Sequence, residues 1–215
     1  MPLQLQGNSG VTSEVEDSST RAMRAVFKPY AYSTFGHYRV SLSILSVTAQ
    51  AANARIAVLR NNAANLIVIT RCTLRAFQVT AGTAQENGLD AYKLTGFTVL
   101  DTTNTVTPAV EVLRATGMAA APGGAQLRTS NAAAGMTGGT STKGSALIGS
   151  LPYNVAASVM TANPWTANIF DPENGEHPLV LAQNEGLLLE NRTLNSTTYG
   201  IRWYVDLSWA EVATF

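Results

Sequence analysis

Charged residues are scarce in this sequence. Asp, Glu, Lys and Arg together make up only 13% of the 215 residues, and the formal net charge is zero. Duplex nucleic acid is bound through clustered Lys and Arg side chains, and no basic stripe stands out, so we expect no nucleic-acid partner. Surfaces that are buried between subunits are depleted in Lys, Glu and Asp. The low charge therefore favours a component of an assembly over a protein that works free in solution.

Residue types that react or bind metals are also rare. Cys72 is the single cysteine, so no internal disulfide can form, and its place on the apolar phase of a strand predicts a small buried side chain. The two histidines, His37 and His177, have no second His or Cys at metal-ligand spacing. We therefore predict no catalytic residue, no cofactor site and no metal site, and we expect that the protein is not an enzyme.

Long apolar runs are missing as well. No stretch reaches the length of a membrane span, and the first residues, MPLQLQGNSGVTSEVEDSS, lack the basic and apolar regions of a secretory signal. We expect no membrane partner, and we expect synthesis and assembly in the cytoplasm. The glycosylation sequons at Asn191 and Asn195 are accordingly interpreted as chance matches in a polar turn.

What the sequence does contain is alternation with a period of two residues. The closing stretch GIRWYVDLSWAEVATF places large apolar residues at alternate positions, namely Ile201, Trp203, Val205, Leu207 and Trp209. Successive side chains of a strand point to opposite faces, so this pattern predicts a strand with one face in the core. Arg202 and Asp206 are then expected on the opposite, polar face.

Similar patterns predict further strands in residues 38–48, 65–79 and 92–100. A strand centred on residues 187–191 is predicted to pair with the closing strand as an antiparallel hairpin, because only a short polar link separates the two. In residues 65–79 one face of the strand is expected to lie in the core, and the other is expected to carry Arg71 and Arg75. The predicted core residues are Leu66, Val68, Cys72, Leu74 and Ala76.

The order of these elements predicts an all-β fold. Strands do not alternate with long amphipathic helices, which argues against a parallel α/β sheet. Short strands separated by Gly, Pro and Asn turns are typical of an antiparallel β-sandwich or jelly roll.

The predicted domain organisation has one folded unit and one arm. Residues 1–25 have no strong core pattern and are predicted to be an extended N-terminal arm, although Ser13–Glu16 also fits the capping box of a short helix. Residues 26–215 are predicted to form a single β-sandwich domain. Within it, the Gly-, Ala- and Thr-rich residues 115–146 are predicted to be a long loop toward a neighbouring subunit, which could include a short strand at 125–130. Residues 152–178 are also predicted to be loop-like.

Three segments resemble binding sites only superficially. Residues 138–145, GGTSTKGS, lack the residue order of a phosphate-binding loop. Asp171, Glu173 and Glu176 could supply paired carboxylates for glycoside hydrolysis or ligands for calcium, but solvation of a Pro- and Gly-containing loop explains them equally well. Trp165 could be an exposed platform for sugars, and we favour the alternative that it packs under its own turn.

The segment GNSGVTSEVEDSSTRAMRAVFKP near the start, and the segments GEHPLVLAQNEGLLLENRT and GIRWYVDLSWAEV at the end, resemble a group of tailed-bacteriophage virion proteins. The resemblance implies a structural protein of the virion, and a capsid decoration or cement protein in particular. Its expected partners are other virion proteins, above all the major capsid protein, and copies of itself in a homo-oligomer for which a trimer is favoured. A cement protein binds only the assembled shell and stabilises it by linkage, so it needs no chemistry.

Two alternatives from other functional classes stay open at this point. One is a tail-associated or adhesion protein that carries a carbohydrate-binding β-sandwich. The other is a glycan-cleaving enzyme whose carboxylates come from separate strands, which one sequence does not exclude.

Overall fold

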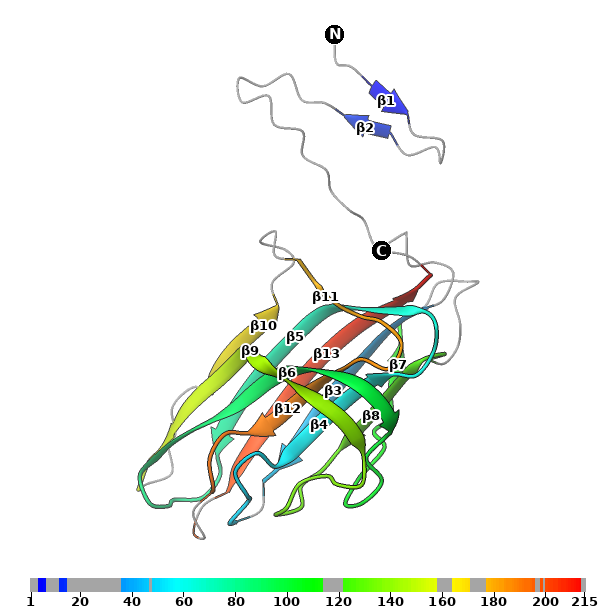
Figure 1. The fold of residues 1–215 in the computed structure, drawn as a ribbon. Coiled ribbons are helices and arrows are strands. Elements are labelled where there is room, and N and C mark those ends of the chain that lie inside the picture. Colours follow the sequence, from blue (N-terminus) through cyan, green and yellow to red (C-terminus); the bar gives the residue numbers. More distant parts are fainter. Residues whose placement is uncertain are drawn as a thin grey trace. The chain divides into compact units, whose positions relative to one another are not determined.

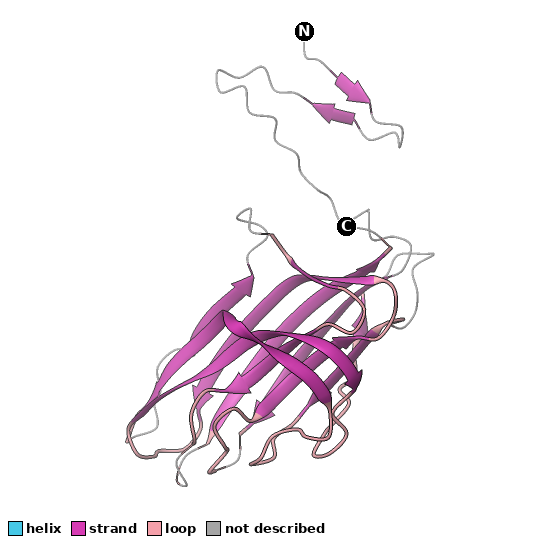
Figure 2. Ribbon diagram, in the orientation of Figure 1, coloured by secondary structure: helices cyan, strands magenta, loops and turns pink. Residues whose placement is uncertain are grey.

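The computed structural model describes residues 4–6, 12–14, 36–46, 48–113, 122–157, 164–170, 177–195, 198 and 200–213. These residues form strands, turns and loops and contain no helix, so the all-β prediction is confirmed (Figures 1 and 2). The chain divides into two compact units, residues 1–31 and residues 32–215. In the first unit, β1 (Gln4–Gln6) pairs antiparallel with β2 (Thr12–Glu14), so the predicted extended arm contains a short hairpin.

The second unit contains two antiparallel sheets (Figure 1). The larger sheet has six strands: β10 (Trp165–Phe170), β5 (Leu66–Gln78), β13 (Ile201–Val212), β3 (Gly36–Leu45) and β7 (Glu111–Val112) in spatial order, with β11 (Leu179–Leu181) also paired to β5. The smaller sheet has five: β8 (Ala125–Thr129), β4 (Arg55–Asn61), β12 (Gly186–Asn191), β6 (Gln85–Val99) and β9 (Thr140–Val155). The main core draws on both sheets, as expected for a β-sandwich.

The closing strand β13 lies at the centre of the larger sheet, hydrogen-bonded to β5 on one side and β3 on the other. The five alternating apolar residues that predicted it are all buried in the main core, which confirms the assignment of that face. Trp209 packs against Tyr38 of β3, with ring centroids 5.7 Å apart. These two large aromatic residues are register partners on adjacent strands, and their contact helps to fix which face of β13 is buried.

The predicted hairpin between the last two strands is wrong. β12 pairs with β4 and β6 in the smaller sheet, whereas β13 belongs to the larger one. All six residues of β12 are buried, so it is a central strand that needs a neighbour on each side. The link between them, residues 192–200, is long enough to cross the roughly 10 Å between packed sheets.

The predicted core face of β5 is correct for only part of the strand. Ser208 of β13 pairs with Arg71, but Trp209 pairs with Ile69, so Thr70 is an extra residue in the ladder. An extra residue moves every side chain beyond it to the opposite face. Cys72, Leu74 and Ala76 lie in the main core as predicted, and the core positions before the bulge are taken by Ile67 and Ile69.

Leu66 and Val68 were predicted on the core face and lie on the outer one. There they form a small separate cluster with Ala210 and Val212 of β13. The bulge thus gives the larger sheet an apolar contact on its outer surface near one end of β5.

The predicted loop at residues 115–146 is wrong in part. The short strand expected at 125–130 is present as β8, but residues 140–146 already belong to β9, and Met136 is buried against Phe97 and Leu100. Residues 114–121 lie outside the described residues. Among the described strands β9 pairs only with β6, and an edge strand tolerates the Gly, Thr, Ser and Pro content that weakened its pattern. The loop-like assignment of 152–178 is also wrong in part, since this range includes the end of β9 and all of β10.

Candidate interaction surface

The buried carboxylates on the outer face of the smaller sheet are each paired with a cation. Asp90 of β6 and Glu190 of β12 are register partners on adjacent strands, which is the kind of placement expected for a carboxylate pair in a glycan-cleaving enzyme. Both oxygens of Asp90 accept hydrogen bonds from Arg192, at 2.7 to 3.2 Å, and Lys143 Nζ lies 2.7 Å from Glu190 Oε1. These contacts satisfy the buried charges and give the two carboxylates a structural role.

The residues with reactive side chains are dispersed. Cys72 is fully buried, as predicted, and burial raises the pKa of its thiol to about 12. His37 is half-buried with its Nε2 3.4 Å from Thr70 Oγ1, and burial lowers its pKa, whereas His177 is exposed. In the part of the chain that the structure describes, no group of three or more His, Cys, Asp or Glu residues could hold a metal ion. Asp171, Glu173 and Glu176 lie outside the described residues.

The remaining sites considered in the sequence have structural roles. Trp165 opens β10 and packs against Tyr153 of β9, with ring centroids 5.8 Å apart, so it contacts the core and is not an open platform. Residues 138–145 form a turn and the first residues of β9, and the Gly139 amide donates to Asp101 Oδ1. Asn191 and Asn195 are buried, and Asn191 Nδ2 donates to the carbonyl of Ala51. Neither sequon asparagine therefore presents its amide nitrogen for glycosylation in the folded domain.

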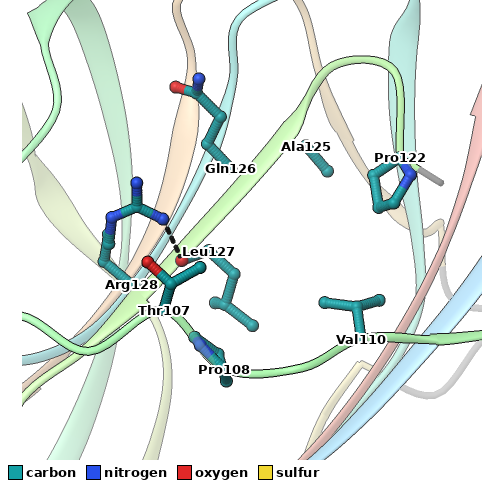
Figure 3. A pocket seen from close by; sticks show the side chains of 8 residues that line it. All are labelled: Thr107, Pro108, Val110, Pro122, Ala125, Gln126, Leu127 and Arg128. Carbon is teal, nitrogen blue, oxygen red and sulfur yellow. Dashed lines mark hydrogen bonds between the residues drawn. The ribbon is translucent and has the colours of Figure 1, made fainter.

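A hollow of about 310 Å³ opens beside β8, where the neighbouring segment of the same chain, which contains Val106, diverges from the strand (Figure 3). Val106 and Thr129 exchange backbone hydrogen bonds of 2.8 and 3.0 Å. Two residues further along that register Pro108 stands opposite Leu127, and proline has no N–H to continue the ladder. The Leu127 carbonyl instead accepts a 3.0 Å hydrogen bond from Arg128 Nη1. The lining is mostly apolar and lacks the convergent polar groups of a specific small-molecule site.

The outer face of the larger sheet is made by the outward side chains of β3, β13 and β5, and it carries both exposed apolar residues and arginines. We call it the arginine face. Its first end is apolar, because Leu45, Phe77 and Val79 leave 42%, 36% and 37% of their surface exposed. Arg202 lies between Leu45 and Phe77 in the strand register, and its Nη1 is 3.4 Å from Ser43 Oγ.

The side chains at the centre of the arginine face are paired with one another. Tyr204 meets Phe77 edge to face, with ring centroids 5.5 Å apart, and the Arg75 guanidinium lies 5.8 Å from the Tyr204 ring centroid. Arg75 Nη2 lies 2.6 Å from Asp206 Oδ2, and Ser41 Oγ donates a 2.6 Å hydrogen bond to Asp206 Oδ1. Asp206 lies on the outer face, as predicted, but these contacts leave it only 6% exposed.

The second end of the arginine face is cationic. Arg39 and Arg71 flank Ser208 in the register and are both exposed. Glu111 of β7 is the register partner of Arg39. In the described part of the chain, four arginines thus share this face with two carboxylates, Asp206 and Glu111, which gives a net positive surface on a chain whose formal net charge is zero. Among the described residues, no ion pair forms to Arg39, Arg71 or Arg202.

Comparison with protein-family models, with curated proteins and with solved structures found no match to this chain. Of the residues that the structure describes, none belongs to a helix long and apolar enough to cross a membrane. The arginine face is accordingly interpreted from its own chemistry.

The arginines of this face could be predicted from the sequence, whereas its apolar end was not predicted. The alternation in β13 placed Arg202 outward, and Arg71 and Arg75 were assigned to the outer face of β5. The apolar end was missed, although Phe77 has the same phase as Arg75 and Leu45 breaks the alternation of β3. An apolar residue at a position where the alternation predicts a polar one indicates an exposed apolar patch, and Phe77 and Leu45 are two such residues.

Proposed function

We propose that this protein is a structural component of a tailed-bacteriophage virion, and that it acts as a capsid decoration protein. The observation that supports this function best is the arginine face, where exposed Phe77 and Leu45 lie beside unpaired arginines. Aromatic residues and Arg are enriched in protein interfaces, while Lys, Glu and Asp are depleted there. The low charge of the whole chain is consistent with the same use. The kind of assembly is proposed from the segments near the start and at the end of the chain, which resemble tailed-bacteriophage virion proteins.

The proposed mechanism is stabilisation by binding. A protein that binds the assembled shell and not its free subunits shifts the equilibrium toward the intact particle. The proposed partner is the major capsid protein, and the proposed state is a homo-oligomer, with a trimer favoured. Several copies of one weak surface that act together bind far more tightly than a single copy.

Sedimentation with particles tests this proposal. The purified protein is mixed with particles that lack it and run through a density gradient, and we expect it to migrate with the particles. Phe77→Ala should weaken this retention, whereas Leu194→Ala, which removes an exposed apolar side chain outside the face, should not. Wild-type protein that stays at the top of the gradient would contradict the proposed function.

The alternative of a carbohydrate-binding adhesion protein is tested by a glycan array. Trp165, the aromatic residue considered for that role, packs against Tyr153, so this alternative has no open aromatic platform at that position. Selective binding of one glycan class, together with no retention on capsids, would favour the adhesion function.

A further inference from the structure

We infer that the arginine face binds an acidic protein surface, with an apolar patch of the partner at one end of the face and a carboxylate cluster of the partner at the other. Only the identification of that partner as a virion protein rests on the proposed function. The chemistry of the partner follows from the face itself.

The two ends of the face are set apart by the strand geometry. Arg202 marks the apolar end and Ser208, between Arg39 and Arg71, marks the cationic end, six positions further along β13. At roughly 3.3 Å per residue, the apolar and cationic ends lie about 20 Å apart. Between them Asp206 is already bound by Arg75 and Ser41. The charges that are left for a partner are therefore those of Arg202 at one end and of Arg39 and Arg71 at the other.

Carboxylates fit these arginines better than a nucleic acid does. Bases bind sheet faces by stacking on open aromatic rings, and here Phe77 stands edge-on to Tyr204 at 76° while Arg75 lies over the Tyr204 ring. Phosphate backbones need a continuous basic track, and the apolar and self-paired parts of the face interrupt one. An acidic protein surface satisfies the arginines with planar carboxylates and covers the exposed apolar side chains.

The size of the face indicates weak binding by each copy. Three adjacent strands that each take up about 4.8 Å of width, over a length of about 20 Å, give a contact area near 300 Å². A stable one-to-one interface usually buries about 800 Å² on each partner. One arginine face is therefore too small to hold a partner tightly, and we expect several faces of one oligomer to act together.

The test uses the full chain and two defined polyanions. Immobilised poly-L-glutamate stands for the acidic protein surface, and an oligothymidylate stands for nucleic acid. Wild-type protein should bind poly-L-glutamate, and the binding should weaken between about 0.05 M and about 0.5 M NaCl as screening increases. Arg39→Glu/Arg71→Glu should reduce this binding by about tenfold, because two attractive charges become repulsive.

Matched variants distinguish binding through the arginine face from a general effect of the protein's charge. Arg128→Glu changes an arginine of the smaller sheet and should leave binding to poly-L-glutamate nearly unchanged. Arg39→Gln/Arg71→Gln removes the same two charges without repulsion and should give an intermediate loss, and all variants should melt like the wild type. An equal loss in Arg128→Glu would overturn the inference, and so would tighter binding to oligothymidylate than to poly-L-glutamate at the same salt concentration.

Retention on particles is measured separately with the same variants. If the wild type is not retained on particles but shows the expected dependence on Arg39 and Arg71 with poly-L-glutamate, the proposed function fails and the inference about the partner's chemistry stands. If particles retain Arg39→Glu/Arg71→Glu as well as the wild type, the arginine face is not the docking surface and the inference is wrong.

Discussion

At the scale of single residues, Trp203 shows how the two faces of one strand differ. Its side chain is fully buried in the main core, and its Nε1 has no hydrogen-bond partner among the described residues, so it contributes through apolar packing. Trp203→Ala should lower the free energy of unfolding by about 3–5 kcal/mol, through lost burial and the cavity that remains. Arg202→Ala, one position away on the outer face, should cost less than about 1 kcal/mol. Urea unfolding of both variants measures this, and equal losses would contradict the assignment of the faces.

Asp206 lies on the outer face but should behave as a buried residue. Asp206→Ala removes the acceptor of two hydrogen bonds, from Ser41 and from Arg75. Because both donors can reach water, we expect a moderate loss of about 1–2 kcal/mol in the free energy of unfolding. Asp206→Asn keeps an acceptor for Ser41 and should cost less. A loss from Asp206→Ala no larger than that from Arg202→Ala would mean that the carboxylate contributes nothing to folding.

Cys72 should be inert in the folded protein. Burial raises the pKa of its thiol to about 12, and the thiolate is the form that reacts with disulfide reagents. We expect no labelling by a thiol reagent at neutral pH under native conditions, and complete labelling in denaturant. Rapid labelling of the native protein would show that β5 opens readily from its neighbours.

At the scale of elements, the residues before β9 should behave as a packed cover and not as a free loop. Met136 is buried with Phe97, Leu100 and Leu188 on the outer face of the smaller sheet. Met136→Ala should therefore lower the free energy of unfolding by about 2–4 kcal/mol. Thr140→Ala, an exposed change at the start of β9, is the matched control and should be nearly neutral. If the two variants unfold alike, the segment does not seal the sheet.

The elements that could be predicted from the sequence are those with one buried face. β3 alternates between buried and more exposed positions along its whole length, and β13 does so over residues 201–204. In both strands the alternation of apolar and polar residues is visible in the sequence. β4 was missed because Ile56 to Leu59 are all buried, so both faces of the strand are apolar and no alternation appears. The pairing of β12 was predicted wrongly because neighbours in sequence need not share a sheet.

The interaction surface was only half predictable for a related reason. Alternation assigns a side chain to a face only until a bulge occurs, and the extra residue at Thr70 reverses the assignment for Leu66 and Val68. Which outward residues are neutralised depends on contacts across strands, such as Arg75 with Asp206, that are distant in sequence. The sequence therefore shows that arginines face outward, and the structure shows which of them are unpaired.

At the scale of the whole molecule, the folded unit and the N-terminal segment should be separable. The described core clusters draw their residues from Tyr38 to Val212, and residues 1–20 carry no periodic set of apolar residues in the sequence. Deleting residues 1–20 should therefore leave the melting temperature of the purified protein nearly unchanged, because the deletion removes no buried apolar side chain of these clusters. Calorimetry of the two proteins measures this.

Under the proposed function the same deletion should weaken retention on particles, since we propose that the arm contacts neighbouring subunits. A second variant, Arg39→Glu/Arg71→Glu, should also weaken retention and leave the melting temperature unchanged, because it changes a different surface. If the arm and the arginine face contact particles independently, combining the two changes should add their free-energy losses. A truncated protein that is insoluble or melts at much lower temperature would show that residues 1–20 stabilise the sandwich itself, and the arm would then have to be counted as part of the fold.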